Sequence, residues 1–181
     1  LSNLTIKMLS DIHLCQKLLE LIKKKLMIKA DVFIANKNWK KYIKNPNFYI
    51  NKKLRKIGKK LSVFKKNNLE FTILLSGGND IKKLNKKFRK KNKTTDILSF
   101  PFHEKKILNT LLKERKHKIY LGDVMINLNK MTSKIKDKNF LFNFDKIWIH
   151  GLVHLLGYRH KSNRDFSMMT KLENKLINFL K

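Results

Sequence analysis

Hydrophobic and polar residues follow two patterns along this chain, and the patterns predict strands and helices. Short apolar runs bounded by turn residues are typical of buried strands. Such runs predict four strands, at residues 30–36, 69–75, 96–102 and 119–126. Apolar residues three or four positions apart predict amphipathic helices. Helices are expected after residue 36, with an interruption at residues 45–47, and at residues 48–66, 80–89, from 127, 141–156 and 165–181. Pro46 is a suitable first residue for the helix that follows the interruption.

The chain is long enough for one domain with a proper core, because 42% of its 181 residues are hydrophobic. It contains no apolar run near the roughly 18 residues of a membrane span. Residues 11–28 are amphipathic, and the composition changes after Met27. Residues 103–118 are expected to form a charged connection that could include a helical turn. We therefore expect an N-terminal extension at residues 1–26, either helical or disordered, and a single domain at residues 27–181.

The charge of the chain adds a candidate partner. Its formal net charge is +30, from 43 basic and 13 acidic residues. A field this positive attracts polyanions, and binding to RNA or DNA would release counterions. An AT-rich genome would explain the excess of lysine over arginine, but it accounts less well for the shortage of acidic residues. The single cysteine, Cys15, excludes an intrachain disulfide and favours a reducing, cytoplasmic location.

The most specific motif is HGLVHLLGYRH at residues 150–160. His150 and His154 are four residues apart, so they lie on one face of a helix. Gly157 is a typical helix stop and allows the chain to turn back, which brings His160 to the same point. Three neutral imidazoles can hold a catalytic zinc ion and leave its fourth position to water. The alternative is that these are ordinary polar residues of a half-buried helix.

The ligand spacing matches the metzincin peptidase motif H-E-x-x-H-x-x-G-x-x-H, with one difference. Gly151 stands where those peptidases have the glutamate general base. Without that carboxylate, a peptidase lacks the group that takes a proton from the attacking water. Zinc lowers the pKa of bound water to about 7, which also suits attack on a phosphodiester. The motif and the charge together favour phosphodiester chemistry on a nucleic acid.

Arg89 is a candidate phosphate ligand. It is one of only five arginines, and it precedes Lys90 and Lys91. Guanidinium is a planar fork that binds phosphate through two hydrogen bonds, which lysine does not reproduce. The alternative is a surface residue at a helix end.

Three blocks of the sequence, in order, resemble the bacterial YbeY family of endoribonucleases. The blocks are LNKKFRKKNKTTDILSFPF at residues 84–102, LGDVMI at residues 121–126, and the histidine motif. The resemblance runs from about Met27 to the C-terminus. It implies an α+β fold in which about five or six helices pack a small mixed four-stranded sheet. A metzincin-like site of three histidines would lie on a helix and the turn after it.

The resemblance also implies a function. The domain would be a zinc-dependent, single-strand-specific endoribonuclease that acts in maturation of the 3′ end of small-subunit ribosomal RNA and in ribosome quality control. His150, His154 and His160 would bind one Zn²⁺, and Arg89 would act on the RNA phosphate beside a zinc-bound water. No protein general base is assigned. Partners would be single-stranded RNA, the small ribosomal subunit and its assembly proteins.

Further residues are expected to contact RNA or to support the site: Lys90, Lys91, Lys93, Ser99, Asp123 and Arg159. Arg159 departs from the family, which usually has aspartate before the third histidine, so an acceptor that orients a histidine could be lost. Two alternatives remain. One is a ribosome-assembly factor that binds RNA, with a structural zinc closed by a fourth ligand such as Asp123 or His103. The other, more remote, is a zinc peptidase.

Overall fold

The computed structural model of the protein describes residues 28–65, 67–114, 118–133 and 139–181. The expected extension at residues 1–26 and its amphipathic pattern lie outside these residues. Within the described part, no helix is both long and apolar enough to cross a membrane.

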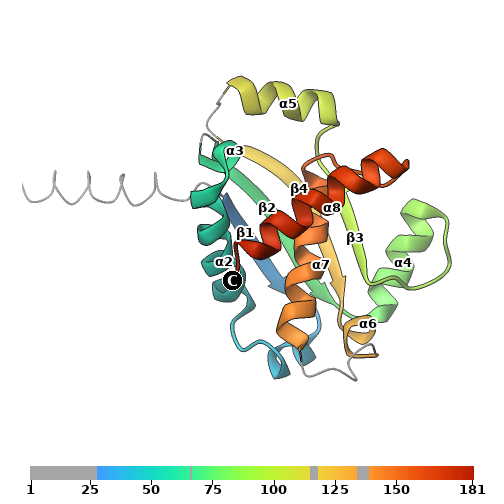
Figure 1. The fold of residues 1–181 in the computed structure, drawn as a ribbon. Coiled ribbons are helices and arrows are strands. Elements are labelled where there is room, and N and C mark those ends of the chain that lie inside the picture. Colours follow the sequence, from blue (N-terminus) through green and yellow to red (C-terminus); the bar gives the residue numbers. More distant parts are fainter. Residues whose placement is uncertain (1–27, 66, 115–117, 134–138) are drawn as a thin grey trace, which may run out of the picture.

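A mixed four-stranded sheet lies at the centre of the fold (Figure 1). Its strands are β1 (Ile28–Ile34), β2 (Leu69–Ser76), β3 (Ile97–Pro101) and β4 (Ile119–Asn127). The spatial order is β1-β2-β4-β3. β1, β2 and β4 run parallel, and β3 pairs antiparallel with β4. The predicted strand count and the mixed α+β class are therefore confirmed.

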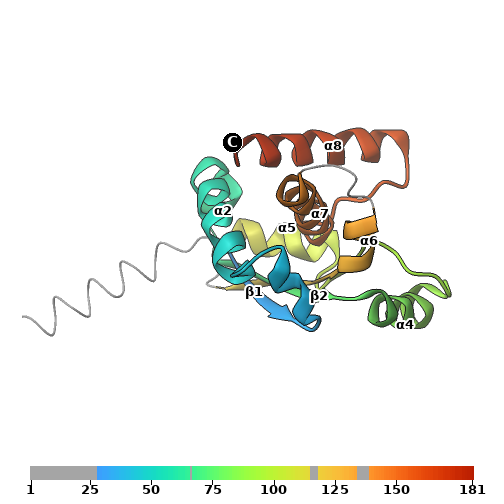
Figure 2. The same cartoon turned by 90° about the horizontal axis from the view of Figure 1, so that it is seen from below.

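Helices pack on both faces of this sheet. They are η1 (Lys37–Lys41), α2 (Pro46–Lys60), α3 (Ser62–Lys65), α4 (Gly78–Arg89), α5 (Lys105–Glu114), α6 (Leu128–Ser133), α7 (Phe140–Leu155) and α8 (Asn163–Asn178). α2 packs against β1, while α7 lies between the sheet and α8 (Figure 2). Side chains alternate between the two faces of a strand, so Leu98 and Met125 point to the other face and pack with Ile81 of α4.

α7 is the central helix, and its composition explains its position. Apolar residues occur almost all round it, and eight of its residues are buried, including Phe144, Trp148 and Leu152. A helix that is hydrophobic on all sides is stable only when it is covered on all sides. The polar positions that remain include its two histidines. α7 is therefore a rigid support for whatever those histidines bind.

Three segments differ from the prediction. Residues 103–118 were expected to be a charged connection with at most a helical turn, but they contain the ten-residue helix α5, whose Leu108 is 1% exposed. The many lysines of this segment obscured an apolar pattern at helical spacing. The helix expected to resume after the interruption at residues 45–47 begins at Pro46, the suggested start, but it is interrupted at Leu61, whose backbone is extended. The first strand begins and ends two residues earlier than expected.

Candidate metal centre

The C-terminal end of α7 places His150 and His154 one turn apart, with ring centroids separated by 4.5 Å. Gly157 follows with a φ of +84°, a left-handed conformation that glycine adopts without strain. Its N–H donates to the carbonyl of His154 and closes the helix end. The chain reverses there and brings His160 to 5.2 Å from His154, measured between ring centroids. The predicted three-histidine cluster on a helix and its following turn is confirmed.

The orientation of the rings fits a metal ion. One ligand nitrogen from each histidine lies within 4.8 Å of the others. The Nε2 atoms of His150 and His154 are 3.0 Å apart. Tetrahedral zinc with Zn–N bonds of about 2.0–2.1 Å needs nitrogens separated by roughly 3.4 Å. His150 and His154 therefore need only a small adjustment to share one ion, while the wider limit of 4.8 Å for the whole cluster means that His160 would move closer to them. The donor set suits zinc and several other transition metals.

Hydrogen-bond acceptors beside the Nδ1 atoms of His150 and His154 also indicate that the Nε2 atoms can bind a metal ion. His150 Nδ1 lies 2.8 Å from Oε1 of Glu173, and His154 Nδ1 lies 2.9 Å from the carbonyl oxygen of Tyr158. Each Nδ1 is therefore assigned the proton, which leaves the Nε2 lone pairs facing each other. Two lone pairs at 3.0 Å repel unless a cation lies between them. Such an arrangement of ligand and acceptor is typical of metal-bound histidine.

The protonation state of His154 also suits a metal ligand. Burial lowers its pKa from 6.5 to about 4, and the nearby His150 and His160 rings act in the same direction. These effects outweigh the carbonyl of Tyr158, which by itself raises the pKa. Metals bind the neutral imidazole, so His154 is in the binding form throughout the neutral range.

Sequence reasoning did not identify Glu173 or the Tyr158 carbonyl as parts of the site. For Glu173 there was a signal, because it lies four residues after buried Met169 and three before buried Leu176. An acidic residue on the inner face of an amphipathic helix needs a partner. The structure also limits the importance of Arg159. The acceptors of His150 and His154 come from elsewhere, so their orientation does not depend on an aspartate at position 159.

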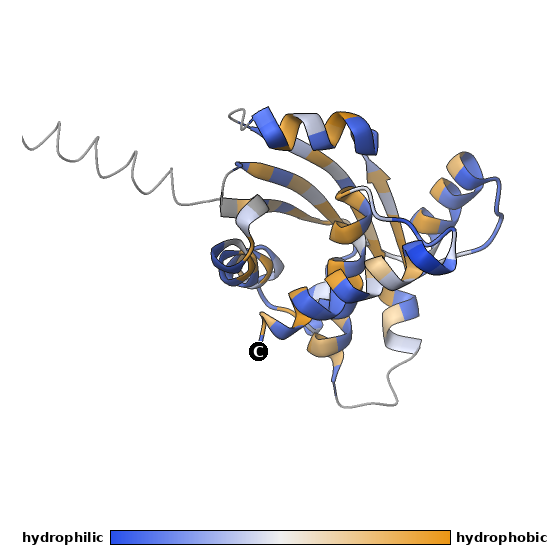
Figure 3. Cartoon of the chain, turned by 45° about the horizontal axis from the view of Figure 1, so that its top comes forward, coloured by the Kyte–Doolittle hydropathy of each residue, from blue (hydrophilic) through white to orange (hydrophobic). Residues whose placement is uncertain are grey.

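A pocket of about 750 Å³, which we call the histidine pocket, opens beside the three rings. Arg89, at the end of α4, lines it together with three further cations, Lys91, Arg159 and Lys161. No carboxylate is among the described residues that line it. The loop that follows α4 is hydrophilic (Figure 3), and its Lys91 and Thr95 line the pocket. A cavity with several cations and no acid favours an anionic ligand such as phosphate.

The other predicted site residues fall in two groups. Ser99 lines the histidine pocket, and its buried Oγ has no hydrogen-bond partner among the described residues. Lys90, Lys93 and Asp123 do not line it. Asp123 is exposed on β4 and accepts a hydrogen bond of 2.6 Å from the Tyr120 hydroxyl. The expectation that Asp123 lines or supports this pocket is not met, because it shares a sheet face with Met125, opposite to α7.

Whether a metal ion would keep an open coordination position depends on whether a fourth protein ligand lies close to the three histidines. Asp123 and His103 were considered as ligands that could close a structural zinc site. Among the described residues, the group that can share one ion consists of His150, His154 and His160 alone. A metal ion bound there would keep a coordination position open, which is the arrangement of catalytic zinc sites.

Close packing of α7 on the sheet explains why position 151 is a glycine. A Cβ atom at this position would lie 2.8 Å from Val124 Cγ1 and 2.9 Å from Ile97 Cδ1. Position 151 therefore faces the sheet at close approach, and a glutamate side chain does not fit there. The missing carboxylate of the peptidase motif follows from how tightly α7 packs on β3 and β4.

Comparisons with known proteins show which family this chain belongs to. A family profile described as Endoribonuclease YbeY matches residues 33–181. A protein of Pelagibacter ubique named Endoribonuclease YbeY is 44% identical over 157 residues, which are 86% of this chain and 97% of the relative. One of Thermodesulfovibrio yellowstonii with the same name is 39% identical over 72% of this chain and 76% of its own. The fold is also similar to a Thermotoga maritima protein solved in solution, with a TM-score of 0.52, 21% identity and coverage of 84% and 88%.

Proposed function

This chain belongs to the endoribonuclease YbeY family, and from that premise we propose that it is a zinc-dependent, single-strand-specific endoribonuclease. The observation that carries the proposal is the position of Arg89 and three other cations in the same pocket as an open three-histidine centre. The proposed cellular role is maturation of the 3′ end of small-subunit ribosomal RNA and ribosome quality control. Its partners would be the small ribosomal subunit and its assembly proteins, in the cytoplasm.

Different residues would bind the metal ion and orient its ligands. His150, His154 and His160 would hold one Zn²⁺ per chain. When bound, zinc would act as a Lewis acid and lower the pKa of water, so that hydroxide is available to attack a phosphodiester near neutral pH. Glu173 and the Tyr158 carbonyl hold two of the rings in the binding orientation. A carboxylate that orients a ligand histidine in this way typically strengthens metal binding.

The phosphate would bind in the histidine pocket. The guanidinium of Arg89 can donate two parallel hydrogen bonds to phosphate oxygens. Lys91, Arg159 and Lys161 surround the same volume and would stabilise the charge that grows on those oxygens during cleavage. His150 and His154 are half-buried in the wall of this pocket and His160 is exposed, and a flexible single strand reaches the two half-buried rings more easily than a stiff duplex does.

Two alternatives have less support. A purely structural zinc would be expected to have four protein ligands, and three are within reach in the described part of the chain. A peptidase would be expected to have a carboxylate beside the metal, and position 151 is occupied by a glycine that packs on the sheet.

The experiment combines metal content with RNA cleavage. Purified protein should contain about one zinc per chain and cut single-stranded RNA. His154→Ala should lose both properties, whereas Arg89→Glu should keep zinc and lose cleavage. Matched controls are His103→Ala and Arg55→Glu, since neither residue lines the histidine pocket. Cleavage that persists in His154→Ala and Arg89→Glu would contradict the proposal, and so would zinc-loaded wild-type protein that binds RNA without cutting it.

A further inference from the structure

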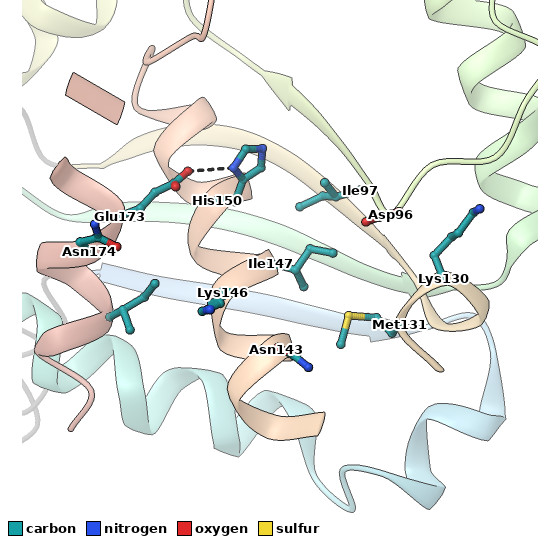
Figure 4. Close-up of a pocket in the computed structure, with 11 residues that line it drawn as sticks. Asp96, Ile97, Lys130, Met131, Asn143, Lys146, Ile147, His150, Glu173 and Asn174 are labelled. Carbon is teal, nitrogen blue, oxygen red and sulfur yellow. Dashed lines mark hydrogen bonds and ion pairs between the residues drawn. The ribbon is translucent and has the colours of Figure 1, made fainter. Parts of the chain in front are cut away.

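A second cavity of about 670 Å³ lies on the other side of His150, and we call it the amide pocket. It shares His150 and Ile97 with the histidine pocket, so the two are adjacent. Figure 4 shows Asn143 and Ile147 of α7 in its centre, Glu173 and Asn174 of α8 on one side, and Ile97 and Met131 on the other. Nothing in the proposed chemistry uses this space.

The pocket-facing side of α7 connects the two cavities. Asn143, Ile147, His150 and His154 are separated by four, three and four residues, so they form one stripe along the helix. His154 lines the histidine pocket, Asn143 and Ile147 line the amide pocket, and His150 lines both. A chain bound at the metal centre can therefore continue along α7 into the amide pocket.

The charges of the two cavities differ. The amide pocket has two lysines, Lys130 and Lys146, and two carboxylates, Asp96 and Glu173, so its formal charge is zero. The histidine pocket has four cations and no acid among its described lining residues. An anionic phosphate is therefore favoured in the histidine pocket, while a neutral polar group is favoured in the amide pocket.

The lining chemistry matches a nucleobase. Ile97, Met131, Ile147 and Ile177 supply apolar surfaces, against which the flat faces of a base can pack. The side-chain amides of Asn143 and Asn174 have no hydrogen bond to another described residue, and both line the cavity. Amides donate and accept hydrogen bonds in one plane, as the edges of bases do. The volume lies within the range of about 300–1,000 Å³ typical of small-ligand sites.

We propose that the amide pocket binds the base of a nucleotide next to the scissile phosphate, so that the enzyme selects its cleavage position by sequence. This inference rests on the proposed function of the histidine pocket. Carboxylate and amide oxygens give the pocket several acceptors, which favour bases with an exocyclic amino group. Adenine, cytosine and guanine carry that group and uracil does not. One such base contact corresponds to a preference of about 5- to 150-fold over uracil.

One test measures base preference during cleavage. Zinc-loaded protein cuts single-stranded pentanucleotides that vary in one base at a time, and kcat/KM is compared between bases. We expect one flanking position to disfavour uracil, and we expect Asn143→Ala and Asn174→Trp to reduce that preference toward unity. Asn174 is exposed, so tryptophan can fill the cavity without disturbing the core. Asn109→Trp, on the exposed side of α5, is the matched control and should retain the preference. Wild-type cleavage without base preference, or variants that keep it, would overturn the inference.

A second test does not depend on turnover. Side-chain amide signals of Asn143 and Asn174 are followed by nuclear magnetic resonance while AMP, CMP, UMP or ribose 5-phosphate is added to the zinc-loaded protein. We expect AMP and CMP to shift both signals, and ribose 5-phosphate to leave them in place. An equal response to ribose 5-phosphate, or none to any nucleotide, would overturn the inference. If these shifts occur but no RNA is cut, the proposed function fails while the base site stands.

Discussion

Replacing Gly151 with alanine tests whether close packing of α7 on the sheet governs this position. The added Cβ would lie 2.8 and 3.0 Å from the two methyl groups of Val124, and 2.9 Å from Ile97 Cδ1. Ile97 Cδ1 is the end of a flexible side chain and can move. Val124 has much less freedom, because a β-branched side chain is restricted at χ1 and its strand lies in the middle of the sheet.

The magnitude follows from two opposing effects. Overpacking a core position typically destabilises by about 1–3 kcal/mol, and two fixed methyl groups place Gly151→Ala in the upper part of that range. Alanine is favoured over glycine inside a helix by about 1 kcal/mol, which offsets part of the loss. We expect a net decrease of about 1–2 kcal/mol in the free energy of unfolding. For a chain of this size that lowers Tm by roughly 2–8 °C.

The assay is urea unfolding of metal-free protein, with Gly78→Ala as the control. A Cβ at Gly78 would have no neighbour closer than 3.7 Å, so this substitution should be neutral or stabilising. Adding Val124→Ala removes the obstructing methyl groups. The double variant should then lose less stability than the two single variants together, by about 0.5 kcal/mol or more. If Gly151→Ala is as stable as Gly78→Ala, the packing argument is wrong.

Three further predictions concern the metal centre and its support. Glu173→Ala removes the acceptor of His150 and should weaken zinc binding by about 10- to 100-fold in competition with a chromogenic chelator. In metal-free protein, His154 should titrate near pH 4 by nuclear magnetic resonance, because burial disfavours its charged form. Its folded-state pKa lies below the unfolded value, so the unfolded state binds more protons between about pH 4 and 6.5, and stability should rise with pH across that window. Asp145→Ala leaves the partly buried Lys53 without its ion pair and should destabilise the metal-free protein by about 3–5 kcal/mol in urea.

For each of these predictions, a control variant or a particular measurement would show that the reasoning is wrong. Glu104→Ala, at an exposed acidic residue outside the site, should leave zinc affinity unchanged; an equal loss there would point to a general charge effect. A His154 midpoint near 6.5 would contradict its burial as the cause of the shift. The Asp145 carboxylate also accepts hydrogen bonds from Tyr49 and Trp148, joining α2 to α7. A loss below about 1 kcal/mol in Asp145→Ala would mean that this network holds the helices only weakly.

Much of the fold could be predicted because its signals are local. The four strands are short apolar runs, and α7 is a long apolar segment, so burial is encoded in each stretch separately. The helix α5 was missed because charged residues dilute its apolar spacing within a single stretch. The break at Leu61 has no comparable signal in the sequence.

The candidate site likewise combines features that the sequence predicts with features that only the structure shows. His150 and His154 share a face because of helix geometry, and Gly157 reverses the chain because of its backbone freedom. Glu173 and the Tyr158 carbonyl complete the centre through contacts that no spacing reveals. Asp123 belongs to a block that resembles the family, yet its strand turns it toward the face opposite α7.

The sequence by itself determined the three-histidine motif, the strongly positive charge and the family, because these depend on residue identity and on spacing within one or two helical turns. Only the tertiary structure decided which cations share a pocket with the histidines, which carboxylate orients them, and why position 151 is glycine. Those features arise where α4, α8 and the sheet meet α7, and contacts between distant segments depend on packing, which a linear pattern does not specify.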